Sequence, residues 1–122
     1  SIECPQTVQL KTDPLLLREV MENLLTNAIK YTPSEGTVHV EAWQERSNVF
    51  IQVQDTGVGI PQDEQDRVFS KFFRAKNILN VETSGTGLGL YLASKLVLAL
   101  GGTITFKSTE GKGTQFLIRL SG

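Results

Sequence analysis

Two asparagines and a lysine recur at helical spacing within one strongly helical stretch of the chain. Asn23, Asn27 and Lys30 are four and three residues apart, so on a helix their side chains lie within roughly 60° of one another. An amide oxygen is a hard ligand that suits Mg²⁺, and a lysine can contact a phosphate as a point charge. Solvated surface residues are the simpler alternative, but asparagine is a poor helix former. Two of them inside a good helix therefore call for a reason.

A carboxylate at the end of a predicted strand is the second candidate group. Asp55 is followed by Gly57 and Gly59. A carboxylate can accept hydrogen bonds from an amine such as the exocyclic nitrogen of adenine, and glycines let a flat ring approach the backbone. Asp-Thr-Gly is also common turn chemistry, so a plain β-turn remains an open alternative.

A glycine-rich segment, Gly85-x-Gly87-x-Gly89, precedes a predicted helix. Backbone N–H groups at a helix N-terminus hold anions well. The segment lacks the Gly-Lys-Ser/Thr ending of a P-loop, and no βαβ unit surrounds it as a dinucleotide site would require. Close helix packing is the competing explanation, for Gly89 in particular.

Composition favours one globular domain. The chain has 122 residues, of which 39% are hydrophobic, and a net charge of −1, so no general attraction to nucleic acid or to an anionic membrane is expected. Cys4 is the only cysteine, which excludes an internal disulfide and a cysteine zinc cluster. The chain shows neither a membrane-length apolar run nor a signal peptide. We expect residues 1–122 to form a single cytoplasmic domain excised from a larger protein, with membrane anchoring of that parent left open.

The apolar periodicity predicts alternating helices and strands. A long helix begins at Asp13-Pro14 and ends at Thr32-Pro33, and a later helix that is apolar almost all round is expected to be buried on more than one side. The other predicted elements are edge strands within 1–11, an antiparallel hairpin of 37–44 and 49–54 with its turn at Ser47-Asn48, a short helix at 63–68, a loop at 75–84, and a final hairpin of 103–108 and 114–120. One sheet with helices packed on one face fits this order.

Aromatic and basic residues lie just before the predicted loop. Phe69, Phe72 and Phe73 are expected to anchor the root of the loop in the core. Arg74 and Lys76 could close over phosphates when the loop folds down, or they could be only solvated.

Taken together and in this order, the motifs resemble those of the catalytic, ATP-binding domain of two-component sensor histidine kinases. That family lies within the superfamily that includes DNA gyrase and the heat-shock chaperone ATPases, and the resemblance covers essentially the whole chain. Residues 23–31 resemble the N box, 55–59 the G1 box, 69–74 the F box, 85–90 the G2 box and 111–114 the last glycine box. The resemblance implies the Bergerat fold, an α+β two-layer sandwich of a mixed, mostly antiparallel five-stranded sheet with three helices on one face.

The resemblance also implies roles for individual residues. Asn27 would hold Mg²⁺ with help from Asn23, Lys30 would contact phosphate, and Asp55 would bind the adenine amine. Asn23 and Lys30 would be the catalytic residues, and residues 75–84 would form the ATP lid. The full implied nucleotide-binding set is Asn23, Asn27, Lys30, Tyr31, Asp55, Gly57, Gly59, Ile60, Phe73, Arg74, Lys76, Gly85, Thr86, Gly87, Leu88, Gly89 and Thr114.

By the same resemblance, the domain would bind Mg-ATP and donate the γ-phosphate to a histidine on a separate helical hairpin domain of the same protein. A response regulator receiver domain would be the next partner, with no nucleic acid and no direct membrane insertion. The isolated domain would be monomeric, because the family's dimer contacts lie in that hairpin. The lid has few basic residues beyond Arg74 and Lys76, a departure from the family pattern.

Two other functions remain open. An ATP-hydrolysing clamp of the gyrase or chaperone type would resemble this chain, but such relatives need a carboxylate to activate water. Asn23 occupies the corresponding position, and an amide cannot take that proton. A degenerate nucleotide-binding docking module is the non-enzymatic alternative.

Overall fold

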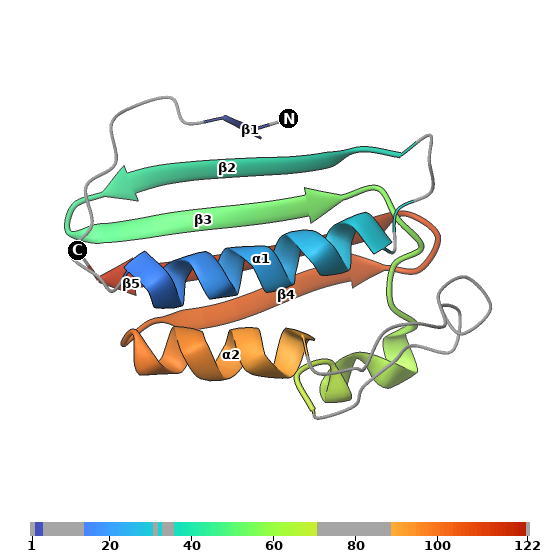
Figure 1. Ribbon diagram of the computed structural model, residues 1–122. Coiled ribbons are helices and arrows are strands. Elements are labelled where there is room, and N and C mark those ends of the chain that lie inside the picture. The colour runs from blue at the N-terminus through green and yellow to red at the C-terminus, as the bar shows by residue number, and fades with distance from the viewer. Residues whose placement is uncertain (1, 4–13, 31, 33–35, 71–88, 122) are drawn as a thin grey trace.

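The computed structural model describes residues 2–3, 14–30, 32, 36–70 and 89–121 (Figure 1). In chain order the described elements are β1 (Ile2–Glu3), α1 (Pro14–Lys30), β2 (Val38–Glu45), β3 (Asn48–Asp55), the 3₁₀ helix η1 (Gln62–Arg67), α2 (Gly89–Ala99), β4 (Thr103–Thr109) and β5 (Gly113–Ser121).

The strands form one mixed sheet in the order β1-β2-β3-β5-β4. The two-residue β1 pairs with β2 in parallel, and the four long strands pair antiparallel. The expected five-stranded, mostly antiparallel sheet is therefore confirmed. In this register Asp55, the last residue of β3, lies between Val38 on β2 and Thr114 on β5, so this carboxylate sits at the end of the central strand.

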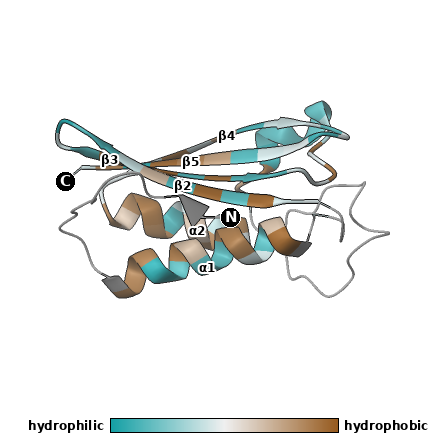
Figure 2. Ribbon diagram, turned by 90° about the horizontal axis from the view of Figure 1, so that it is seen from above, coloured by the Kyte–Doolittle hydropathy of each residue, from teal (hydrophilic) through white to brown (hydrophobic). Residues whose placement is uncertain are grey.

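The sheet and the two α-helices form two layers. Both helices lie on the same face of the sheet, and Figure 2 shows the two layers edge-on. The helices contact each other and run in opposite directions, so α2 begins beside the second half of α1 (Figure 1). The start of the glycine-led helix therefore comes close to the asparagine stripe.

The prediction of a third helix on this face needs a correction. Among the described residues it is the six-residue 3₁₀ helix η1, at the end of the sheet and not an α-helix of the helical layer. Its sequence, QDEQDR, has no apolar stripe with which an α-helix could pack on the sheet. Short 3₁₀ pieces are typical of such connectors.

The core fills the space between the layers. On α1, Val20, Leu24 and Ala28 recur every four residues and are almost fully buried, as the predicted apolar face requires. The sheet contributes the inward positions of its alternating strands. These are Val40, Val49, Ile51, Val53, Phe116, Ile118 and Leu120, and α2 adds Leu90, Ala93 and Val97.

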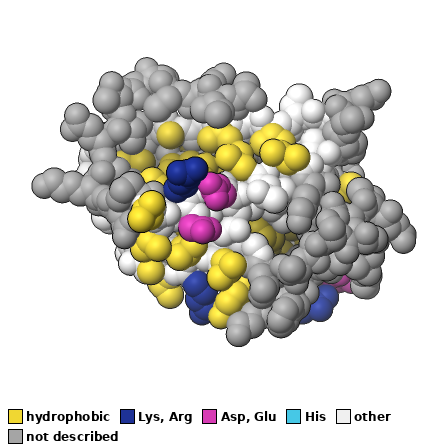
Figure 3. All heavy atoms as spheres, in the orientation of Figure 1, with side chains coloured by type: hydrophobic (Ala, Val, Ile, Leu, Met, Phe, Trp, Pro, Cys, Tyr) yellow, Lys and Arg dark blue, Asp and Glu magenta, His cyan; other side chains and the backbone are white. Residues whose placement is uncertain are grey.

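The expectation that α2 is buried on more than one side is confirmed, because the helix packs on both α1 and β4, but a further side is exposed. Leu92 and Leu98 are 45% and 68% exposed. The helix lies at the edge of its layer, where it packs on α1 and β4, and one of its sides has no neighbour among the described elements. Figure 3 shows hydrophobic side chains on this helical face around charged ones. None of the described helices is long and apolar enough to cross a bilayer.

The first hairpin turns one residue earlier than predicted. Asn48 already pairs with Glu45, so Arg46 and Ser47 form the turn, and Arg46 adopts a positive φ of 56°. The sequence signal from Ser47 and Asn48 marked the region, but it could not fix the register of the turn.

Removing the buried side chain of Leu24 tests the two-layer core. Leu24→Ala should lower the free energy of unfolding by about 2–5 kcal/mol, because the helix and sheet cannot collapse fully into the space left behind. Leu98→Ala is the matched control, and its exposed side chain should change stability by no more than about 0.5 kcal/mol. Urea unfolding followed by circular dichroism measures both. Equal losses would contradict the packing described.

Candidate functional site

Asp55 has one carboxylate oxygen anchored and one left open. The backbone N–H groups of Gly57 and Thr114 both donate to Oδ1, at 2.8 and 3.2 Å. Oδ2 has no hydrogen-bond partner in the part of the chain that the structure describes. The residue as a whole is only 6% exposed. The carboxylate is therefore fixed in orientation, with a free acceptor for a ligand that carries a donor.

Burial changes the proton affinity of this carboxylate. Loss of water around Asp55 raises its pKa above the ordinary value, and the hydrogen bonds from Gly57 and then Thr114 lower it in part. Desolvation disfavours the charged form, whereas N–H donors favour it. The net upward direction means that the folded protein holds this proton more tightly than the unfolded chain does.

The loop after Asp55 rests against the turn between β4 and β5. Gly59 has a positive φ of 70°, and a Cβ there would overlap the carbonyl oxygen of Thr109. The N–H of Gly111 donates to the carbonyl of Val58 at 2.7 Å. Glycine at position 59 is therefore required by the close approach of two backbone segments, a reason that the sequence analysis did not consider.

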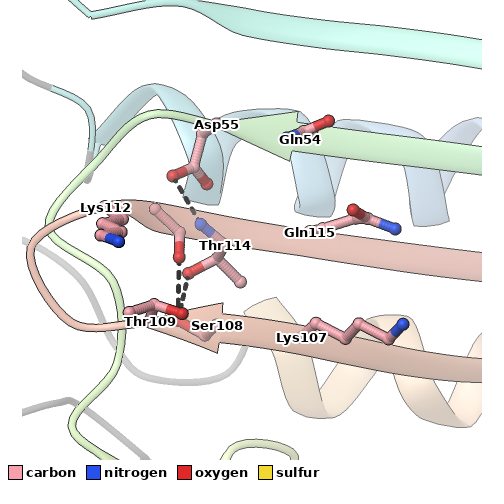
Figure 4. Close-up of a pocket in the computed structure, with 9 residues that line it drawn as sticks. Gln54, Asp55, Lys107, Ser108, Thr109, Lys112, Thr114 and Gln115 are labelled. Atoms are coloured by element: carbon pink, nitrogen blue, oxygen red, sulfur yellow. Dashed lines mark hydrogen bonds between the residues drawn. The ribbon is translucent and has the colours of Figure 1, made fainter.

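A polar cluster joins this loop to β4 and to η1. Ser108 Oγ accepts a hydrogen bond from the N–H of Ile60 at 2.8 Å and lies 2.8 Å from Thr114 Oγ1. Gln65 Nε2 donates to the carbonyls of Ile60 and Ser108 at 3.0 and 3.1 Å. Figure 4 shows Asp55, Ser108 and Thr114 on three adjacent strands. This end of the sheet is thus held by side-chain hydrogen bonds as well as by strand pairing.

The asparagine stripe of α1 faces the start of α2. A Cβ built on Gly89 would lie 3.9 Å from Asn23 Oδ1, an ordinary contact, so the described surroundings do not demand glycine for close packing there. The Nδ2 atom of Asn23 is buried and has no hydrogen-bond partner among the described residues. Asn27 is half-buried one turn further on. A buried amide of this kind ordinarily has a partner, which a polar ligand between the helices would supply.

These residues suit a magnesium ion held jointly with its ligand. The described residues contain no group of three His, Cys, Asp or Glu side chains that could hold a metal. Mg²⁺ usually keeps several waters and shares substrate phosphates, so it needs few protein ligands. Amide oxygens of Asn27 and Asn23 are chemically able to provide them. The unpaired Nδ2 of Asn23 is a donor, so it would need an acceptor such as a phosphate oxygen beside the ion.

The described residues of the predicted set fall into two groups. Asp55, Gly57, Gly59, Ile60 and Thr114 gather where β3 ends and β5 begins. Asn23 lies beside Gly89 at the start of α2, and Asn27 follows one turn further along α1. The C-terminal ends of α1 and β3 are at the same end of the molecule (Figure 1).

Many predicted site residues lie outside the described part of the chain. Lys30 ends α1, but its side chain is not described. The remaining predicted residues outside the described ranges are Tyr31, Phe73, Arg74, Lys76, Gly85, Thr86, Gly87 and Leu88, as is the lid at 75–84. Phe69 is described, and it packs on the core against Phe106 and Phe116, as expected.

A cavity of about 240 Å³ opens near the same end of the sheet. Gln54, Lys107 and Gln115 contribute to its lining from positions that alternate with the buried ones. Asp55, Ser108 and Thr114, which are inward positions, line it as well, and Figure 4 shows these residues together at the end of the sheet.

Sequence reasoning missed Ser108 and Gln65. Ser108 had a detectable signal, since it is polar at an inward position of a strand, in register with Ile104 and Phe106. A polar side chain at such a position needs hydrogen-bond partners. Gln65 had none, because its role depends on η1 meeting β4, a contact between segments 43 residues apart.

Comparisons with known proteins agree on one family. Residues 12–121 match the model of the "Histidine kinase-, DNA gyrase B-, and HSP90-like ATPase" family. The circadian input-output histidine kinase CikA of Synechococcus elongatus is 43% identical over 88% of this chain and 14% of its own length. The chain thus spans about one seventh of that relative.

Solved structures show the same likeness. The mycobacterial sensor histidine kinase MprB has a TM-score of 0.82 and 32% identity, covering 99% of this chain and 84% of the other. Full-length ShkA in complex with AMPPNP has a TM-score of 0.70 and 33% identity, covering 86% of this chain and 21% of the other.

Two glycines with positive φ test the contact between the loop and the β4–β5 turn. Gly59→Ala should lower the free energy of unfolding by at least about 2 kcal/mol, because a Cβ overlaps the backbone at Thr109 as well as straining φ. Gly111→Ala, with φ of 85° and open space around it, should lose only about 1–2 kcal/mol from strain. Thermal and urea unfolding compare the two. A Gly59→Ala loss no larger than that of Gly111→Ala would refute the contact.

The raised pKa of Asp55 predicts a pH dependence with a definite sign. A folded-state pKa above the unfolded value gives stability that is full below the unfolded pKa and lost as pH rises through the folded pKa. Asp55→Asn removes this titration and keeps an oxygen for the two N–H donors. The variant should therefore gain stability relative to the parent as pH rises from about 3 to 7.

Urea unfolding at several pH values measures that difference. Glu41→Gln, which neutralises a half-buried residue of β2, serves as a control for general charge effects. If the parent instead gains stability relative to Asp55→Asn as pH rises, the hydrogen bonds from the N–H donors lower the pKa of Asp55 more than burial raises it. The assigned direction of the pKa shift would then be wrong.

Proposed function

Because the chain belongs to the family of histidine kinase-, DNA gyrase B- and HSP90-like ATPases, we propose that it binds Mg-ATP and donates the γ-phosphate to a histidine on another domain. The observation that carries this proposal is Asp55, a buried carboxylate with one oxygen anchored and the other open. Within this family, such a carboxylate is suited to binding the exocyclic amine of adenine. The complex of the similar ShkA with AMPPNP supports a nucleotide as the ligand.

The sheet would hold the base. Asp55 Oδ2 would accept a hydrogen bond from the exocyclic amine, and Thr114 is its cross-strand neighbour on the inward face. Gly57, Gly59 and Ile60 form the loop beside them, with Gly59 fixed against the β4–β5 turn. A pocket built from strand ends and a hydrogen-bonded loop is largely preformed, as ligand sites commonly are.

The helices would hold the phosphates. Asn27, with Asn23, would bind Mg²⁺, which when present neutralises charge on the phosphates. Lys30 would add its own positive charge, and Gly89 would offer backbone N–H groups at the start of α2. Catalysis would rest on positioning and charge neutralisation, since a histidine acceptor brings its own nucleophilic nitrogen.

The acceptor histidine would lie outside the domain. His39 is the only histidine of the chain, and it is the second residue of β2, which pairs with a strand on each side in the sheet. The matched part is about one seventh of the relative CikA, which leaves room for a phosphoacceptor hairpin domain in the same protein. A receiver domain of a response regulator would take the phosphate next, and the domain, which we take as 1–122, would be monomeric and cytoplasmic.

A histidine kinase explains Asn23 better than an ATP-hydrolysing clamp does. Clamp enzymes need a general base near the attacking water, and the amide of Asn23 cannot serve as one. Its neighbour Glu22 is exposed and paired with Arg18 at 3.1 Å, on the solvent side of α1.

Magnesium-dependent binding tests the proposal. In calorimetric titrations with AMPPNP, Mg²⁺ should strengthen binding to the parent chain. Asn27→Ala should weaken binding in Mg²⁺ by at least about tenfold, equivalent to about 1.4 kcal/mol, because the chain loses an amide oxygen for the ion. Thr26→Ala, exposed on the same helix, is the matched control.

Two results would contradict the assignment. No binding by the parent chain with or without Mg²⁺ would leave the docking module as the better description. Binding that is equally strong in Asn27→Ala would remove that residue from the magnesium site.

A further inference from the structure

Three polar contacts meet at the side chain of Ser108. The N–H of Ile60 donates to Oγ at 2.8 Å, Oγ lies 3.1 Å from the carbonyl oxygen of Gly113, and Thr114 Oγ1 is 2.8 Å away. These partners come from the loop after β3, from the first residue of β5 and from its second residue. One hydroxyl thus connects the two segments that flank Asp55.

The contacts fix the direction of the hydroxyl protons. A serine hydroxyl has one proton to donate and two lone pairs to accept. The carbonyl of Gly113 can only accept, so the contact there uses the proton of Ser108. The contact with Thr114 Oγ1 then needs the proton of Thr114. This is the one assignment that gives each of the three contacts a proton.

Thr114 consequently presents only lone pairs to its remaining surroundings. Its single proton points to Ser108, and no donor within the described ranges reaches its Oγ1. Asp55 faces it across the strand pair, with side chains of such neighbours about 5 Å apart at Cβ, and Asp55 Oδ2 is likewise an acceptor without a partner there. Two acceptors side by side match an amine, which carries two protons.

We propose that Ser108 is a positioning residue for base recognition: it makes Thr114 a hydrogen-bond acceptor and ties the loop to β5, so that Asp55 and Thr114 together select a 6-amino purine. The inference rests on the proposed function, because it concerns the base of the same nucleotide. Ser108 acts through Thr114 and Ile60 and need not touch the ligand. Gln65 supports the arrangement from η1, through its bonds to Ile60 and Ser108.

The consequence of losing this hydroxyl is specific. In Ser108→Ala the Thr114 proton loses its partner, so the hydroxyl can rotate and turn a donor toward the amine. The N–H of Ile60 loses its acceptor, and the loop beside Asp55 loses a tether. Recognition of the amine should suffer, while contacts to ribose and phosphates should not.

The experiment compares ADP with purine riboside 5′-diphosphate, which carries hydrogen in place of the amine. Calorimetry in Mg²⁺ gives the ratio of the two affinities for each variant of the 122-residue chain. We expect this ratio to fall by about tenfold in Ser108→Ala, mainly through weaker ADP binding. Ser108→Thr keeps a hydroxyl and should restore most of the ratio. Thr109→Ala, on the exposed neighbouring residue of β4, should leave it unchanged.

The outcomes separate the inference from the proposed function. Absence of ADP binding by the parent chain refutes the proposed function, and the inference with it. If the parent binds ADP and Ser108→Ala weakens both ligands equally, the role of Ser108 is only structural and the inference is overturned. An unchanged ratio in Ser108→Ala overturns it as well.

A second variant covers the case in which Ser108→Ala does not fold. Thr114→Val removes the acceptor and nearly preserves the shape of the side chain, so it should lower the same ratio by a similar factor. If Thr114→Val has the same ratio of the two affinities as the parent chain, Thr114 presents no acceptor to the base. That result contradicts the proposal.

Discussion

The antiparallel pairing of β3 with β5 is the constraint on which the candidate site depends. Its register places Asp55 opposite Thr114, with both side chains on the inward face. A slip of one residue would turn every side chain of β3 to the opposite face, moving Asp55 outward together with Val53 and Ile51. Because those two buried residues resist such a slip, the hydrophobic core also fixes the orientation of the Asp55 carboxylate.

A second constraint comes from the space around that carboxylate. Burial disfavours the charge of Asp55, and two backbone N–H groups compensate only in part, since its pKa is still raised. Both N–H groups converge on one oxygen. This arrangement stabilises a single orientation of the side chain and leaves Oδ2 without a partner among the described residues, which is the compromise expected of a group that is proposed to bind a ligand.

The sequence allowed most of the fold to be predicted, because apolar periodicity reports directly on burial. The four-residue spacing of Val20, Leu24 and Ala28 and the alternation along β3 both correspond to buried positions. The exposed Leu98 shows the limit of this reasoning, since periodicity cannot tell whether a neighbouring element exists to cover a side. The predicted short helix at 63–68 is present as a 3₁₀ helix instead of an α-helix of the helical layer, because helix propensity over six residues says little without a packing surface.

The candidate site was less predictable than the fold. Motif spacing pointed to Asp55 and Asn23, but the structural reason for Gly59 and the hydrogen bonds of Ser108 depend on contacts between distant segments. Such contacts become visible only when the β4–β5 turn is placed against the loop after β3. Residues that position a ligand group through another residue therefore leave a weaker trace in one sequence than residues that would touch the ligand.

The two halves of the candidate site lie in different layers, and the core between them determines how they cooperate. Asp55 belongs to the sheet, whereas Asn23 belongs to α1 and faces the start of α2. Leu24, the immediate neighbour of Asn23, is fully buried in the core that joins the layers. Since close-packed interiors resist small displacements, the distance between the proposed base-binding half and the proposed phosphate-binding half is set by this packing. A nucleotide that reaches both halves would therefore be matched to a spacing that the core has fixed before binding.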